Sequence, residues 1–438
     1  MSKSKLFLIL ASAFLISCAN PNDPDNGNDT GTGGGTGGGG GTGNPSWFLT
    51  AEKQKTPWSI DKTLAITVSG KAHYRITGIL ATKHAKNNNK IIAIYDNRKT
   101  SNADIGFTAA ANLEPLIKIS EDGGNTWGAE ITVGPVATSK DTSHGDPVIF
   151  EANNGDIVVL AAAGGAWATA PSNPSRISVI KSTDGGKNWG QWKDVQGTMF
   201  ESGKLYNAGF RKGFASSGRG TILKDNTLVC AVLCGDANAS AASRGVALFY
   251  SKDNGDTWNV GGFKVYGHST EASGGFDEPK VSAELVDGKI LLSARPNNYG
   301  NNRLWLVADN VDTNPVEFAT VDLVDGNANA EGVRYTATWN GQTKNRLLFI
   351  NCNSKNSRRK ELTIHLSEDE GKTYSTKRLL NAENSCYSSV DVLGDGTIIT
   401  FGEETPTAST GLDIYNLVFR RFNLAWLTQG KEIYSENY

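Results

Sequence analysis

SEDGGNTW, at residues 120–127, is the first of four copies of one eight-residue pattern. The other three copies, which we call boxes together with the first, are STDGGKNW at 182–189, SKDNGDTW at 251–258 and SEDEGKTY at 367–374. Each box predicts a hairpin turn, because its Asp accepts hydrogen bonds from the turn backbone, its Gly supplies a positive φ and its aromatic residue packs beneath the loop. The four box aspartates are therefore expected to be structural rather than catalytic.

The spacing of the boxes predicts the architecture. Their aspartates lie 62, 69 and 116 residues apart, and the last interval is close to two of the others, which indicates a decayed copy near 307–310. A period of this size, made of short strands and turns, is typical of a β-propeller whose blades have four antiparallel strands each. Strand-like runs at 156–161, 227–233, 289–294 and 346–350 agree. We predict an all-β fold, a six-bladed β-propeller with box turns, over residues 46–438.

The N-terminus is expected to be processed. Lys3 and Lys5 precede a short apolar run at 6–16, which is typical of a signal peptide, and the sequence LISC that ends at Cys18 resembles a bacterial lipoprotein box. We expect residues 1–17 to be a lipoprotein signal peptide and 18–45 to be a lipidated Cys18 with a flexible Gly/Thr/Asn-rich tether. The protein would then be exported and held by its lipid at the outer membrane or cell surface. An ordinary signal peptide with an incidental cysteine is the alternative.

Charge and cysteine content exclude several classes of protein. The net charge is −2, with acids and bases interspersed, so no basic surface for nucleic acid is predicted. The other four cysteines are Cys230, Cys234, Cys352 and Cys386, and they match no zinc spacing. Cys230 and Cys234 would be about 13 Å apart on one strand, too far for a disulfide. We expect buried free thiols, although a longer-range pairing stays open.

The first motif outside the boxes is YRIT at 74–77. It resembles the aromatic-Arg-Ile-Pro motif of the bacterial sialidases, exo-acting neuraminidases built on a six-bladed propeller, with Thr77 in place of the proline. The resemblance extends over essentially all of 46–438 and implies that Arg75 binds the substrate.

A second motif carries an arginine and a carboxylate. YDNRKTSNADIG at 95–106 resembles the sialidase segment with a second arginine and, six residues later, the catalytic aspartate. Arg98 and Asp104 have that spacing. Asp96 is a rival carboxylate that lies out of register.

Two looser matches follow along the chain. Asp146, in the sequence GDP at 145–147, and Trp167 resemble a substrate-contacting Asp-Pro and a tryptophan that lines the pocket for the N-acyl group. A turn Asp before Pro and a core Trp are the simpler alternatives.

The most specific match is FDEPKVSAELVDGKILLSAR at 276–295. It resembles the family's Glu, alternating strand, Asp-Gly turn, apolar strand and terminal Arg, and it implies that Glu278 and Arg295 belong to the site. The interval from Glu278 to Arg295 is one residue longer than in the common pattern, so Glu284 remains a weak rival to Glu278.

Two final motifs lie around the last box. SRRKELTI at 357–364 resembles an Arg-x-x-Leu element, in which Arg359 aligns better than Arg358. CYSS at 386–389 resembles the Tyr-Ser motif of the nucleophile, which implies that Tyr387 is this group.

Together these groups suit a sugar that carries a carboxylate on its anomeric carbon. The resemblance implies that Arg75, Arg295 and Arg359 bind the carboxylate of sialic acid, for which forked guanidinium donors are well shaped. The same carboxylate repels an anionic nucleophile, which is a reason for a phenol to replace the usual second carboxylate.

The implied mechanism is hydrolysis with retention. Tyr387 attacks, Glu278 is its base, and Asp104 protonates the leaving oxygen and later activates water. Arg98 beside Asp104 stabilises the ionised carboxylate, so we expect an acidic pH optimum. The expected substrates are sialylated glycoproteins, glycolipids and oligosaccharides, and no metal or organic cofactor is expected.

Other functions use overlapping residues. A trans-sialidase has the same catalytic set and passes the sugar to another glycan. A sialic-acid-binding adhesin would keep the arginines without needing the catalytic groups. A box-bearing propeller that cleaves plant polysaccharide with two carboxylates would not need three spaced arginines.

Overall fold

The computed structural model describes residues 44–434, apart from 69–70, 100, 107–111, 169–172, 238–242, 269–274, 319–320, 340–341 and 406–413. The expected signal peptide, Cys18 and nearly all of the expected tether lie outside the described residues. Pro45–Tyr438 form one compact unit. No helix in the described ranges is long and apolar enough to cross a bilayer.

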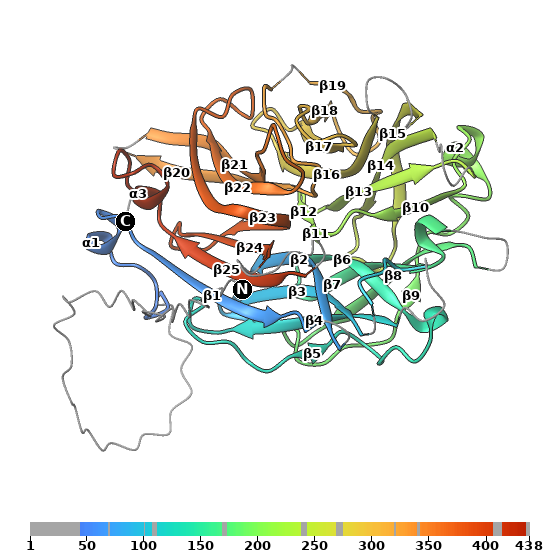
Figure 1. Ribbon diagram of the computed structural model, residues 1–438, viewed down its shortest axis with the longest axis horizontal. Coiled ribbons are helices and arrows are strands. Elements are labelled where there is room, and N and C mark those ends of the chain that lie inside the picture. Colours follow the sequence, from blue (N-terminus) through green and yellow to red (C-terminus); the bar gives the residue numbers. More distant parts are fainter. Residues whose placement is uncertain are drawn as a thin grey trace, which may run out of the picture. The chain divides into compact units, whose positions relative to one another are not determined.

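The unit is built from antiparallel sheets, which lie side by side around a common centre in Figure 1. One sheet contains β2 (His73–Ala81), β3 (Ile91–Arg98), β4 (Leu113–Ser120) and β5 (Ile131–Thr132). The next contains β6 (His144–Glu151), β7 (Ile157–Gly164), β8 (Ser175–Ser182) and β9 (Lys193–Asp194), with β11 (Gly218–Arg219) parallel to β6. A third contains β10 (Lys212–Ala215), β13 (Leu228–Gly235), β14 (Ser243–Ser251) and β15 (Asn259–His268), with β12 (Thr221–Ile222) paired to β13. A fourth contains β16 (Phe276–Glu284), β17 (Ile290–Pro296), β18 (Leu304–Ala308) and β19 (Val316–Glu317).

The fifth sheet has seven strands and joins the two ends of the unit. Its order is β1 (Ser59–Ile66), β25 (Asn416–Phe422), β24 (Ile398–Glu404), β23 (Thr376–Val392), β22 (Lys360–Ser367), β21 (Gln342–Cys352) and β20 (Glu331–Trp339). Ser59 pairs with Phe422, so the first strand closes the arrangement against the last. Short helices complete the described elements: α1 (Ala51–Gln54), α2 (Gly203–Asn207), α3 (Leu424–Leu427), and the 3-10 turns Ala85–Asn87, Lys140–Thr142 and Ala166–Ala168.

The all-β class and the propeller-like arrangement are confirmed. The predicted number of six blades is not confirmed, because the described strands form five hydrogen-bonded sheets. Strands β2, β6, β11, β16 and β23 lie nearest the centre in Figure 1. The ends of these inner strands therefore surround the axis of the fold.

The core consists of apolar layers between neighbouring sheets. In β7, Ile157 and Val159 pack toward the preceding sheet with Ile92, whereas Val158 and Leu160 pack toward the following sheet. Successive strand residues face opposite sides, and both sides of β7 are covered. This explains why the strand-like runs in the sequence are continuously apolar rather than alternating.

The boxes form the turns between third and fourth strands, as their chemistry predicts. In the first box, Ser120 Oγ accepts from Gly124 N at 2.8 Å, Asp122 accepts from Thr126 N at 2.8 Å and Thr126 Oγ1 at 2.6 Å, and Trp127 Nε1 donates to Gly124 O at 3.1 Å. The segment expected to hold a decayed copy lies at the equivalent turn, between β18 and β19. The box aspartates are thus used by their own turns.

The four cysteines of the described chain are buried free thiols. Cys230 and Cys234 lie on β13 with both side chains in the core. This agrees with the expectation from their spacing.

Candidate active site

The inner strands carry irregularities at the positions of the predicted site residues. Register shifts interrupt β2 between Arg75 and Gly78, β6 between Gly145 and Val148, β16 between Asp277 and Pro279, and β23 between Ser385 and Ser388. A bulge bends a strand and redirects a side chain, and bulges are frequent beside active sites. The four shifts contain or adjoin Arg75, Asp146, Glu278 and Tyr387.

Three site residues also have an unusual backbone conformation. The φ angles of Asp146, Glu278 and Arg359 are 51°, 23° and 56°. Non-glycine residues seldom adopt positive φ, and such strain is found where a function requires a side chain to point in one direction.

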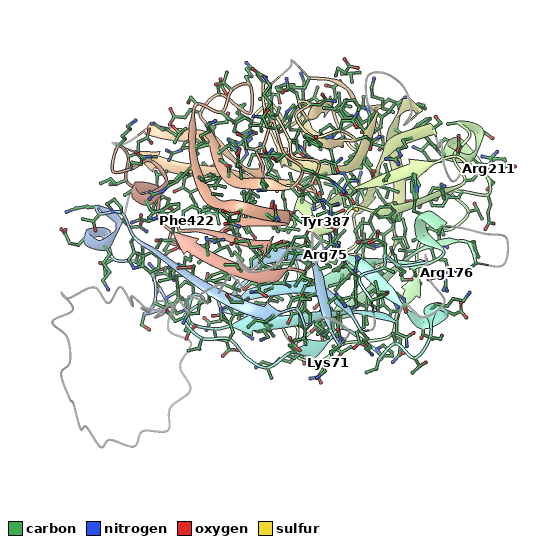
Figure 2. All side chains as sticks on the ribbon, in the orientation of Figure 1. Lys71, Arg75, Arg176, Arg211, Tyr387 and Phe422 are labelled. Carbon is green, nitrogen blue, oxygen red and sulfur yellow. The ribbon has the colours of Figure 1, made fainter. Side chains whose placement is uncertain are left out.

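A cavity of about 280 Å³ lies among these residues. It is lined by seven of the nine side chains that the sequence predicts for the site: Asp104, Asp146, Trp167, Glu278, Arg295, Arg359 and Tyr387. Arg75 and Arg98 are buried behind this wall, with 5% and 1% of their surface exposed. Arg75 lies next to Tyr387 near the centre of the fold, as Figure 2 shows.

Tyr387, Glu278 and Arg295 form one connected group. The Tyr387 hydroxyl donates a hydrogen bond to Glu278 Oε1. Arg295 Nη1 lies 3.2 Å from the Tyr387 oxygen and 3.0 Å from Glu278 Oε2, and Arg295 Nη2 lies 2.9 Å from Asp277. A phenol, its proton acceptor and a cation beside the phenol oxygen are thereby held together.

Burial controls the protonation of this pair. It raises the pKa of Glu278, an effect that the Arg295 cation opposes and Asp277 reinforces. It also raises the pKa of Tyr387 well above the ordinary value, and the Glu278 carboxylate raises it further. The phenol therefore keeps its proton in the resting site and presents it to a carboxylate.

Arg75 is fixed by a carboxylate and an aromatic ring. Its Nε lies 2.9 Å from Glu403, which also accepts from the backbone N–H of Tyr387 at 3.1 Å. The guanidinium carbon lies 5.4 Å from the centre of the Tyr387 ring. Thr77, where the related motif has proline, donates to the Tyr387 carbonyl at 3.2 Å. Strand β2 is thus tied to the segment that carries the phenol.

Arg98 holds a group of three aspartates. Its nearest atoms lie 2.6 Å from Asp104, 3.3 Å from Asp96 and 4.0 Å from Asp146. Burial raises the pKa of Asp96 to about 6, although Arg98 lowers it, and burial together with Asp96 raises the pKa of Asp146 well above its usual range. The side chain of Asp104 is 62% exposed. Partial desolvation acts to raise its pKa, but the Arg98 and Arg75 cations, together with the hydrogen bond from Arg98, outweigh this and the pKa is lowered.

A further part of the cavity wall is aromatic and cationic. Trp167 packs edge-on against Phe214 at 6.2 Å. Lys212 Nζ and the Arg244 guanidinium lie 4.6 Å and 5.2 Å from the Trp167 ring. Trp167 is therefore a wall residue and not a core tryptophan.

Comparison with known proteins places the chain in a family. Residues 110–399 match the BNR repeat-like domain family, which is about two thirds of the chain. The chain belongs to the BNR repeat-like domain family. A sialidase from Micromonospora viridifaciens is 28% identical over 387 residues, which cover 82% of this chain and 52% of that protein. The chain therefore spans about half the length of this relative.

Solved structures with the same fold also include sialidases. A Hadza microbial sialidase superimposes with a TM-score of 0.62 at 21% identity, over 80% of this chain and 65% of the other. An intramolecular trans-sialidase from Ruminococcus gnavus superimposes with a TM-score of 0.61 at 15% identity, over 82% of this chain and 96% of the other. The predicted resemblance to sialidases is confirmed for this BNR repeat-like domain, in sequence and in fold.

Of the three rival residues that the sequence suggested, two lie outside the cavity lining and one belongs to it. Asp96 is completely buried and accepts from the backbone N–H of Asp146 at 3.2 Å, outside the cavity lining. Glu284 lies at the opposite end of β16 from Glu278, where it accepts from Lys224 N at 2.6 Å. Arg358, in contrast, lines the cavity beside Arg359.

Two charged residues of the cavity lining were missed by the sequence analysis. Arg244 on β14 lines the cavity and forms an ion pair with Asp277, which in turn contacts Arg295. Asp277 directly precedes Glu278, so its position in the motif was a usable signal. No sequence signal marks Arg244, because only the packing of one sheet beside another brings it to the site.

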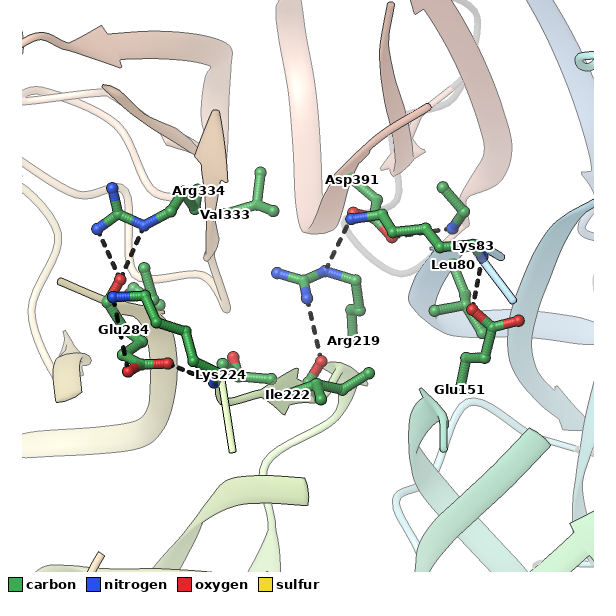
Figure 3. Close-up of a pocket in the computed structure, with 15 residues that line it drawn as sticks. Leu80, Lys83, Glu151, Arg219, Ile222, Lys224, Glu284, Val333, Arg334 and Asp391 are labelled. Carbon is green, nitrogen blue, oxygen red and sulfur yellow. Dashed lines mark hydrogen bonds and ion pairs between the residues drawn. The ribbon is translucent and has the colours of Figure 1, made fainter. Parts of the chain in front are cut away.

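A second cavity of about 200 Å³ lies at the opposite ends of the inner strands in this domain (Figure 3). Three of its charged groups are bound to backbone atoms. Arg219 donates to Val390 O at 3.2 Å, Glu151 accepts from Lys83 N at 2.5 Å, and Asp391 accepts from Ala81 N at 2.8 Å. These contacts join neighbouring sheets, so the charges here have a structural use.

Proposed function

We propose that the protein is a retaining exo-α-sialidase that hydrolyses terminal sialic acid from glycans. The observation that carries the proposal is the hydrogen bond from Tyr387 to Glu278. The two residues lie in a cavity that Arg295 and Arg359 also line. A buried phenol paired with a carboxylate suits the Tyr nucleophile of sialidases. Arginine-rich walls suit an anionic sugar.

Recognition begins with the carboxylate of the sugar. Arg295 and Arg359 line the cavity, and Arg75 stands behind the Tyr387 ring. Charge-assisted hydrogen bonds from guanidinium groups bind carboxylates in a fixed orientation. This orientation puts the anomeric carbon over the phenol oxygen.

In the first step, a bond forms between the Tyr387 oxygen and the anomeric carbon while the glycosidic C–O bond breaks. The phenol proton moves to Glu278, and the Arg295 cation 3.2 Å from the phenol oxygen stabilises the developing negative charge. Asp104 donates its proton to the leaving oxygen, for which its exposed side chain is accessible.

In the second step, water attacks the anomeric carbon and the bond to Tyr387 breaks. Asp104 takes a proton from the water, and Glu278 returns its proton to the phenol. Two displacements at one carbon give net retention. No atom from a metal or cofactor takes part in these steps.

Transfer to a second sugar is the other candidate reaction, because it uses the same groups with a glycan hydroxyl in place of water. Its support is the shared fold with an intramolecular trans-sialidase. Incubation with a sialoside donor and lactose separates the two: free sialic acid is expected as the product, whereas sialyllactose or an anhydro sugar would indicate transfer.

We also infer that the propeller has six blades. The support is β23, which is 17 residues long and pairs with β22 through its first half and with β24 through its second half. The seven-stranded sheet then represents two blades that share one strand.

The membrane anchor remains a proposal from the sequence. Lipidation of Cys18 would place the enzyme at the outer membrane or cell surface, where sialylated glycans are accessible. Cys18→Ala is expected to release the protein from the membrane fraction. Unchanged fractionation would contradict the anchor.

Release of 4-methylumbelliferone from its α-sialoside tests the enzyme proposal. Wild-type protein is expected to be active, and Asp104→Ala is expected to keep part of its activity because this leaving group needs little acid assistance. A folded wild-type protein that binds sialyllactose without cleaving it would instead favour an adhesin.

A further inference from the structure

Two adjacent arginines in the cavity wall have no acidic partner in the part of the chain that the structure describes. Among the residues that the structure describes, the ion pairs include none for Arg358 or Arg359, whereas Arg75 and Arg295 each contact a carboxylate. Among the described residues, the side-chain hydrogen bonds of both arginines go to one residue: Arg358 Nε lies 3.3 Å from Asn327 Oδ1, and Arg359 Nε lies 3.4 Å from Asn327 O. With respect to the described residues, their terminal nitrogens are thus left for a ligand.

The two arginines differ in depth. Arg359 is half-buried, whereas Arg358 is exposed, although both line the cavity. The neighbouring Arg359 cation is the main cause that lowers the pKa of Arg358. Two like charges side by side repel each other, and an anion bound between them or to either one relieves this repulsion. One sugar carboxylate gives Arg359 a partner and leaves Arg358 with its charge unmatched.

The proposed function indicates what lies beside Arg358, and the inference rests on it. In a sialoside, the carboxylate and the glycosidic oxygen are attached to the same carbon. If Arg359 binds that carboxylate, the aglycone leaves the ring close by, toward the exposed side of the cavity. An exposed cation next to Arg359 is therefore closer to the aglycone than to the far end of the sugar.

We propose that Arg358 binds a carboxylate on the aglycone, so that the preferred substrates are glycans in which the terminal sialic acid is linked to a second sialic acid. Arg358 is then a specificity-determining residue. It selects substrates by a second negative charge and takes no part in bond breaking.

The test compares three substrates: 3'-sialyllactose, α2,8-disialyllactose, and the disialyl compound with its inner carboxylate amidated. Values of kcat/KM are measured for the wild type, Arg358→Gln and Arg358→Lys. Lys360→Gln is the matched control, because it removes the same charge two residues away at a position outside the cavity lining. Thermal unfolding shows that the variants are folded.

Arg358→Gln is expected to lower kcat/KM for disialyllactose about fivefold, equivalent to about 1 kcal/mol for an exposed ion pair. The other two substrates are expected to change less than about twofold. Arg358→Lys should recover part of the loss, and 0.5 M salt should reduce the difference between wild type and variant. Lys360→Gln should leave all three values unchanged.

Two results would overturn the inference while leaving the proposed function intact. Equal losses on all three substrates would place Arg358 in the binding of the terminal carboxylate. Unchanged kinetics on all three would show that its charge is not used. Wild-type protein inactive on every substrate would contradict the proposed function itself, and the inference with it.

Discussion

The hydroxyl of Tyr387 on β23 donates a hydrogen bond to Glu278 on β16, a residue 109 positions earlier in the chain. Both side chains are redirected by strand irregularities, and Arg295 contacts both of them. Because this contact crosses between two sheets, it depends on the closure of the whole arrangement. The chemistry that we propose depends on it in turn.

Tyr387→Phe is expected to reduce kcat for sialyllactose by a factor of roughly 10³ or more, because it removes the attacking atom and leaves the ring in place. The measurement is steady-state hydrolysis, with circular dichroism to verify the fold. Tyr250→Phe is the matched control, since it removes a hydroxyl that binds Asp312 at the surface. Comparable rates for the Tyr387 variant and wild type would exclude the phenol as nucleophile.

Arg98→Gln is expected to move the high-pH limb of kcat for sialyllactose to higher pH. Asp104 must be protonated to assist the leaving group, and the Arg98 cation lowers its pKa despite the opposing effect of burial. Removing the cation raises that pKa, so the protonated form persists to higher pH. Arg176→Gln, at an exposed ion pair with Asp194, should leave the profile unchanged. A limb that stays in place in Arg98→Gln would separate Asp104 from the acid step.

Asp96→Asn is expected to be more favourable for stability, relative to wild type, at pH 8 than at pH 4.5. Burial raises the folded pKa of Asp96 from 3.8 to about 6, although Arg98 acts against it. The protonated Asp96 side chain contributes to the free energy of unfolding. This contribution is fully present below pH 3.8 and is lost as the pH rises through about 6. The difference between variant and wild type in the free energy of unfolding should thus grow with pH, by up to about 3 kcal/mol. Urea unfolding measures it, with the exposed Asp287→Asn as control. A difference that does not depend on pH would contradict the raised pKa.

Asp122→Ala is expected to lower the free energy of unfolding by about 1–3 kcal/mol, because the turn loses the hydrogen bonds from Thr126 and Ser120. The value of kcat/KM should be unchanged, since the box lies at the turn between β4 and β5. Asp287→Ala, which removes one turn hydrogen bond that Asp287 accepts from Lys289 N, should cost less. Lost activity in a stable Asp122→Ala protein would refute the structural interpretation of the boxes.

The fold could be predicted from the sequence because its signals are local. Each box defines a turn within eight residues, and the interval between Asp122 and Asp184 measures the repeat. The number of hydrogen-bonded sheets does not follow from the repeat, since β23 is long enough to pair with β22 and β24 at once. That continuity depends on the length of β23 and on its pairing with both neighbours, which no turn signal describes.

The site could be predicted only in part. Motifs led to seven residues that line the cavity, but Arg75 and Arg98 are outside its lining, where Arg75 contacts Glu403 and Arg98 contacts Asp104. Arg244 was not found, because its contact with Asp277 joins strands from different sheets. The raised pKa values of Asp96 and Asp146 beside Arg98 likewise depend on burial, which the spacing of residues in the sequence does not reveal.

The most direct test of the central claim is to identify the covalently modified residue. The protein is incubated with an activated sialoside fluorinated beside the anomeric carbon, which slows the second step, and is then digested and analysed by mass spectrometry. We predict one sugar adduct per chain, on the peptide that contains Tyr387, and its absence in Tyr387→Phe. An adduct on Glu278 or another carboxylate, or turnover without any adduct, would contradict the account.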